Sequence, residues 1–90
     1  MELKDTIEMM NSDDYKDRFI AEYWQTKIRY EKLKAFNTRI EAAKNLIYEG
    51  KDAVIPQHDC PDNLLTEQQH IMGNYLHILE VRAVIEGIEL

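Results

Sequence analysis

Cysteine, proline and glycine are all scarce in this chain of 90 residues. It contains one cysteine (Cys60), two prolines and three glycines. A lone cysteine excludes an internal disulfide and favours a reducing compartment. So few turn-forming residues are atypical of an all-β domain, which needs many short connections. The sequence therefore predicts long helices in a cytoplasmic protein.

Long apolar runs are missing as well. No segment approaches the roughly 18–20 apolar residues that span a bilayer, so we expect no membrane partner. The opening Met1–Asp5 is acidic and interrupted, unlike a secretory signal. Seventeen acidic residues against 11 basic ones give a net charge of −6, which argues against general nucleic-acid binding. With 44% hydrophobic residues, the composition fits a single folded domain over residues 1–90.

The few helix breakers divide the chain into three expected helices. They cover residues 2–10, 13–49 and 61–86, with a connector over 50–60. Gly50 is expected to end the long helix in a left-handed conformation. The predicted fold is all-α: a long antiparallel helical hairpin with a short N-terminal helix.

The apolar surface of these helices is wider than one neighbour can cover. Along the second helix, one stripe is spaced by three and four residues: Phe19, Tyr23, Thr26, Tyr30, Leu33, Phe36, Ile40, Ala43 and Ile47. Ile20, Trp24 and Ile28 form a second strip on another face. The third helix has an expected apolar face of Leu64, Leu65, Ile71, Met72, Tyr75, Leu76, Ile78, Leu79 and Ile85. We therefore expect a homo-oligomeric bundle; the alternative is a compact monomer with the long helix broken near Ile28.

Polar residues recur every seven positions or so inside the expected hairpin. They are Gln68, Tyr75 and Arg82 on the third helix, and Thr26, Tyr30 and Asn37 on the second. If Glu49 lies opposite Asp62, Tyr30 lies near Arg82, and Asn37 lies near Tyr75. This seam either fixes the helix register or lines a ligand cavity. Gly73, inside the third helix, indicates close approach of a backbone from a neighbouring subunit.

Charge is unevenly distributed along the chain. Residues 1–22 carry 3 − 7 = −4, residues 23–50 carry 6 − 3 = +3, and residues 51–90 carry 2 − 7 = −5. The basic island consists of Lys27, Arg29, Lys32, Lys34, Arg39 and Lys44. Within it, Tyr23, Lys27, Tyr30 and Lys34 share one helical ridge, where tyrosine can stack on a base and lysine can bind phosphate. The alternative is a solvated face with ordinary ion pairs within the helix.

No pattern in the sequence predicts catalysis. His58, Cys60, His70 and His77 are too widely or poorly spaced for a metal site. No third group orients a Cys60–His58 pair, and no glycine-rich phosphate loop is present. We therefore expect no catalytic residues, no metal and no cofactor, in a protein that is not an enzyme.

Several segments, most of them in the third helix, resemble a known family. They are Tyr30-Glu31-Lys32-Leu33, Cys60-Pro61, Leu64-Leu65, Gln69, Met72-Gly73-Asn74-Tyr75-Leu76, Leu79-Glu80, Arg82-Ala83 and Ile85-Glu86-Gly87-Ile88. The family comprises small phage and prophage proteins related to a crAss-like phage product. The layout is also similar to phage nucleotide-sponge proteins of the anti-CBASS and anti-Thoeris type. The resemblance implies a phage protein in the bacterial cytoplasm that binds a cyclic nucleotide signal without cleaving it.

These observations give an expected function of anti-defence sequestration. The ligand would be a small anionic nucleotide, such as a cyclic oligonucleotide or a cyclic ADP-ribose isomer. The expected ligand-binding residues are Tyr23, Lys27, Arg29, Tyr30, Lys34, Tyr75 and Arg82. One alternative is an acidic, DNA-mimicking inhibitor of a host defence nuclease; another is a phage structural or assembly component.

Overall fold

The longest helix begins after a capping residue and ends shortly before a glycine. In the computed structural model, which describes residues 1–90, helix α2 spans Tyr15–Tyr48. The Asp14 side chain caps it by accepting a hydrogen bond from the backbone N–H of Lys16 at 2.9 Å. Gly50 has a φ of +82°, the left-handed conformation expected after a helix end. The helix runs unbroken through Ile28, so the alternative with a break there is wrong.

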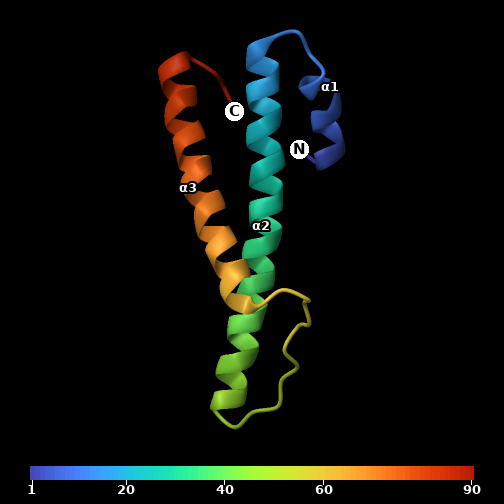
Figure 1. Ribbon diagram of the computed structural model, residues 1–90, viewed down its shortest axis with the longest axis vertical. Helices are drawn as coiled ribbons and strands as arrows, with labels where there is room; N and C mark the ends of the chain where they lie inside the picture. The colour runs from blue at the N-terminus through green and yellow to red at the C-terminus, as the bar shows by residue number, and fades with distance from the viewer.

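The remaining elements pack along α2, and no strand is present. A 3-10 turn, η1 (Leu3–Thr6), continues into α1 (Ile7–Met10), and both contact α2. Helix α3 (Asp62–Glu86) returns antiparallel to α2. In Figure 1, η1 and α1 lie beside the N-terminal part of α2, on the side away from α3. The predicted all-α hairpin with a short N-terminal helix is confirmed.

The register of the hairpin differs from the expected one. Tyr30 lies against Gly73 and not near Arg82. Asn37 donates hydrogen bonds to the Leu65 carbonyl (3.1 Å) and to Gln69 (2.8 Å), and it does not pair with Tyr75. The predicted pairings across the seam are therefore wrong.

The connector causes this shift. It runs back along α2, as Figure 1 shows, and brings the His58 ring to a centroid distance of 5.6 Å from the Phe36 ring. Helix α3 therefore starts beside Lys44, which pairs with Asp62, rather than beside Glu49. The last turns of α2 extend beyond the start of α3.

Gly73 has a different role from the one expected. A Cβ atom there would lie 3.2 Å from Cε1 of Tyr30. The glycine thus admits the tyrosine ring of the same chain, and the prediction that it admits the backbone of another subunit is wrong.

The buried core is small and lies at the end of the hairpin that holds the C-terminus. Its cluster consists of Phe19, Tyr23, Leu76, Leu79, Ala83 and Ile88. Eleven of the 90 residues are buried, and the chain measures 55 × 25 × 19 Å. A molecule this slender leaves much of its apolar surface in contact with solvent. None of its helices has the length and apolar character needed to cross a membrane.

The inner face of α3 is narrower than the sequence predicted. Leu65, Leu76 and Leu79 are buried against α2, as expected. Five residues assigned to the same face are instead exposed: Leu64, Ile71, Tyr75, Ile78 and Ile85. In contrast, the strip of Ile20, Trp24 and Ile28 is half-buried. The apolar surface that remains uncovered therefore lies mainly on α3.

Candidate functional site

The structure brings three of the seven expected ligand-binding residues together on one side of α2. The ammonium groups of Lys27 and Lys34 lie 5.9 and 6.0 Å from the centroid of the Tyr30 ring. Lys27 also forms an ion pair with Glu31 at 3.1 Å. Because the ring packs against Gly73 and one of the two lysines has a carboxylate partner, this ridge has little free binding capacity.

Tyr23 lies in the core rather than on a ligand-binding surface. Its ring is buried and packs edge-on against Trp24, with a centroid distance of 5.4 Å. Its hydroxyl donates a hydrogen bond to Glu80 at 2.7 Å. Burial and this hydrogen bond raise the pKa of the Tyr23 hydroxyl to about 12. Tyr23 therefore stabilises the hairpin and is not available to stack on a base.

Arg82 belongs to a separate group of interactions near the C-terminal end of α3. Its guanidinium contacts Glu86 at 3.1 Å, donates to the Tyr15 hydroxyl at 2.6 Å and lies 5.1 Å from the centroid of the Phe19 ring. The interaction with the Tyr15 oxygen, followed by the hydrogen bond to Glu86, raises the pKa of Arg82 and outweighs the opposing effect of desolvation. Its charge is largely satisfied within the chain.

Tyr75 is also engaged within the chain. Its hydroxyl donates a hydrogen bond to Glu22, and this bond, with burial, raises the pKa of Tyr75. The expected residues thus fall into separate groups and do not form one pocket.

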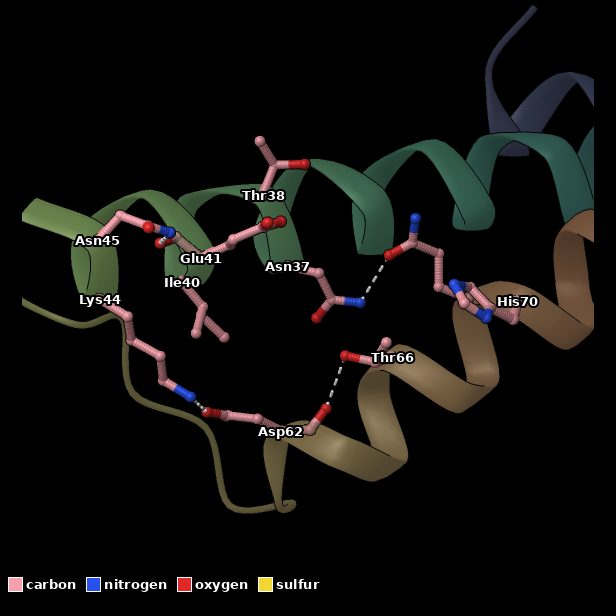
Figure 2. Close-up of a pocket in the computed structure, with 10 residues that line it drawn as sticks. Asn37, Thr38, Ile40, Glu41, Lys44, Asn45, Asp62, Thr66 and His70 are labelled. Atoms are coloured by element: carbon pink, nitrogen blue, oxygen red, sulfur yellow. Dashed lines mark hydrogen bonds and ion pairs between the residues drawn. The ribbon is translucent and has the colours of Figure 1, made fainter.

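The largest hollow, of about 450 Å³, lies between α2 and α3 at the end of the hairpin where α3 begins, and Figure 2 shows it. Lys44 pairs there with Asp62, and Asn37 is bonded to Gln69. Glu41 adds a second carboxylate to the lining. A hollow with two carboxylates and a paired lysine is poorly suited to an anion.

A second cavity, of about 380 Å³, lies between α2, the connector and α3, and we call it the connector cavity. Its lining consists of Arg29, Leu33, His58, Cys60, Leu65, Gln68 and Met72. The lining combines an apolar surface with a guanidinium, an imidazole and an amide, and it contains no acidic residue. Apolar side chains that converge with a few polar groups are a common feature of ligand sites, and here the polar share of the lining is large.

Cations without a carboxylate partner gather on α2. Of the six bases in the basic island, Lys27 and Lys44 form ion pairs, whereas Arg29, Lys32, Lys34 and Arg39 do not. Arg29 and Lys32 are three residues apart and so are neighbours on the helix surface. Arg29 is the residue of this group that lines the connector cavity.

Sequence reasoning singled out Arg29 as a binding residue and Gln68 as part of a polar seam, but it missed the rest of the connector cavity. His58 and Cys60 were considered only as a metal site or a nucleophilic pair. Here the His58 Nδ1 atom accepts a hydrogen bond from the Cys60 backbone N–H at 3.0 Å. Leu65 and Met72 were expected to be apolar contacts, and nothing in their spacing shows that a connector passes beside them. The returning path of residues 50–60 was the missing information.

Comparison with known proteins gives one family. The model of the Sequestin family matches residues 13–85, which include α2, the connector and nearly all of α3. No curated protein and no solved structure matches the chain. The matched segment contains every residue that lines the connector cavity. The chain therefore belongs to the Sequestin family, whose name suggests a sequestering protein.

Proposed function

We propose that this protein binds and sequesters a small anionic nucleotide without cleaving it, and that the ligand occupies the connector cavity. Candidate ligands are cyclic oligonucleotides and cyclic ADP-ribose isomers. The protein would thereby remove a bacterial defence signal during phage infection. The observation that carries this proposal is the position of Arg29, a guanidinium without a carboxylate partner, in the lining of a cavity that has both apolar and polar walls and no acid.

The lining suits the two parts of a nucleotide. A guanidinium can donate two parallel hydrogen bonds to phosphate oxygens, and it keeps its charge at any physiological pH. Leu33, Leu65 and Met72 supply apolar contacts for a base, and the Gln68 amide can both donate to and accept from its edge. A cavity of about 380 Å³ is also within the usual range for small-molecule sites.

The absence of turnover is part of the proposal. The His58 Nδ1 atom is bonded to a backbone N–H rather than to the Cys60 thiol, so the two side chains do not form a nucleophile–base pair. Sequestration requires tight binding and no chemical step, so the ligand should be released chemically unchanged.

The acidic interaction alternative depends on the acidic residues near the N-terminus, and several of these already have local roles. Asp14 caps α2, and Asp5 accepts a hydrogen bond from the backbone N–H of Glu2 at 2.8 Å. Asp17 accepts one from Ser12 at 2.8 Å, and Glu2 pairs with Lys4 at 3.4 Å. These carboxylates stabilise the N-terminal segment, and Glu2, Asp5 and Asp14 remain exposed.

Calorimetric titration against a panel of cyclic di- and trinucleotides and cyclic ADP-ribose isomers tests the proposal. We expect one panel member to bind, and Arg29→Ala to weaken it by about 10- to 100-fold, since hydrogen bonds to charged groups contribute about 1.5–3 kcal/mol.

Two matched variants serve as controls. Lys16→Ala removes one exposed positive charge near the start of α2 and should leave the affinity unchanged. Lys34→Ala tests the Tyr30 ridge: loss of binding in this variant, with Arg29→Ala unaffected, would move the site to that ridge. No heat of binding with any panel member, from folded protein, would overturn the proposed function.

A further inference from the structure

An uncovered apolar ridge runs along α3. It consists of Leu64, Ile71, Ile78 and Ile85, spaced by seven residues, and we call it the α3 ridge. The exposed fractions of these side chains are 51%, 59%, 54% and 77%. The 21 residues from the first to the last member correspond to about 32 Å of helix. We propose that the α3 ridge is the contact surface between two copies of this chain.

The seven-residue spacing favours a helical partner. Two helices that pack along their length return to the same relative orientation every seven residues. A partner without a long helix would not require this repeat over three intervals. Another copy of the chain offers such a helix with the same spacing, so the ridge can pack against itself through a two-fold axis.

Charge also favours a second copy at this surface. Each chain carries a net charge of −6, so two copies repel each other overall. The positions that flank the α3 ridge on its two sides are Glu67, Gln68, Asn74, Tyr75, Val81 and Arg82. They contain one acid, Glu67, and one base, Arg82, which pairs with Glu86. The flanks therefore carry few unpaired charges, and two copies meet little like charge along the ridge.

The structure also provides a recess for the partner. An apolar hollow of about 400 Å³ lies beside Leu64 and Ile71, and five of its seven lining residues are hydrophobic. A ridge side chain from a second copy can enter it as a knob enters a hole in a coiled coil. This recess shares Cys60, Leu65, Gln68 and Met72 with the connector cavity, so the partner helix would border the cavity. The dimer contact itself does not depend on the proposed nucleotide.

Sedimentation analysis of the full chain tests this proposal. At high micromolar concentration we expect a mass of 2 × 10.7 = 21.4 kDa. Ile71→Glu and Ile78→Glu each place a carboxylate in the contact and should raise the dissociation constant of the dimer by about 100-fold or more, because an uncompensated buried charge costs several kcal/mol. Both side chains are more than half exposed in the single chain, so circular dichroism should show unchanged helix content.

Val84→Glu is the matched control. Val84 is on the same helix and is 83% exposed, but it is not part of the α3 ridge, so this variant should remain a dimer. Arg29→Ala should also remain a dimer, which separates this proposal from that of nucleotide binding. A wild-type mass of 10.7 kDa at all concentrations would overturn the proposal, as would dimers that persist in both ridge variants.

Discussion

At the scale of single residues, Gly73 and Tyr30 determine how closely the two long helices approach. The tyrosine ring occupies the space that a side chain at position 73 would fill. A glycine inside a helix costs about 1 kcal/mol relative to alanine. This cost is offset here by the packing of Tyr30 between the helices.

A double-mutant cycle tests this explanation. Gly73→Ala should raise the free energy of unfolding by less than the usual difference in helix propensity between glycine and alanine, because the new Cβ would lie 3.2 Å from the Tyr30 ring. In a Tyr30→Ala background, the same substitution should stabilise the protein by the full value of about 1 kcal/mol. Urea denaturation of the four proteins provides the free energies of unfolding. Equal gains in both backgrounds would show that the ring does not restrict this position.

The hydroxyl of Tyr23 makes the stability of the protein depend on pH in the alkaline range. Its pKa is about 12 in the folded protein, against 10.0 for an unperturbed tyrosine. The folded state therefore retains a proton that the unfolded state loses, so the free energy of unfolding should fall between pH 10 and about 12. Below pH 10 the contribution is fully present.

Denaturation curves of Tyr23→Phe at several alkaline pH values test this dependence. In this variant the free energy of unfolding should fall less steeply with pH. Part of the fall should remain, because the pKa values of Tyr15 and Tyr75 are also raised. Tyr48→Phe changes an exposed ring and should retain the wild-type decline. If Tyr23→Phe and wild type lose stability equally, another group is responsible.

At the scale of the elements, the end of α2 determines where the connector begins its return. Gly50 adopts a φ of +82° with no atom within 4 Å of a built Cβ, so its requirement is conformational and not steric. The backbone N–H of Lys51 donates to the Leu46 carbonyl at 2.9 Å across this turn. A residue that disfavours the left-handed region should disrupt the turn.

Gly50→Ala should therefore lower the free energy of unfolding by about 1 kcal/mol, because alanine tolerates this region poorly. Gly50→Asn should cost less, since asparagine adopts the left-handed conformation more readily. Thermal and urea denaturation give both values. An alanine variant as stable as wild type would mean that the turn tolerates a right-handed conformation.

The elements also show what the sequence could and could not predict. Gly50 and the cap at Asp14 are local signals, so the limits of α2 were predictable to within two residues. The pairing of Tyr30 with Arg82 was wrong because the register depends on the path of the connector, which no periodicity encodes. The face of α3 that contacts α2 was predicted to be wider than it is, for another reason. Apolar residues cover so much of this helix that hydrophobicity alone does not show which stripe contacts α2.

The candidate site was predictable to a similar degree. The basic island drew attention to Arg29, a residue on one helix, which the structure places in the lining of the connector cavity. The walls of the connector cavity come from three segments that are distant in sequence, including His58 and Met72. Their proximity follows from the register, so it could not be inferred before the register was known.

At the scale of the whole molecule, the elongated shape links the two proposals. A chain of 55 × 25 × 19 Å with eleven buried residues has little interior in which to enclose a ligand. Its cavities are therefore open hollows between elements, and the connector cavity lies beside the apolar recess at the α3 ridge. Association of two copies would shield both from solvent. Ligand binding and dimer formation should then strengthen each other.

Retention and recovery of the ligand test the central claim of sequestration most directly. The protein is dialysed against the nucleotide identified by calorimetry, then denatured, and the released material is identified by mass spectrometry. We predict that wild type retains the nucleotide in stoichiometric amount and releases it with unchanged mass, and that Arg29→Ala retains much less. Release of a cleaved product, or equal retention by wild type and Arg29→Ala, would contradict sequestration in the connector cavity.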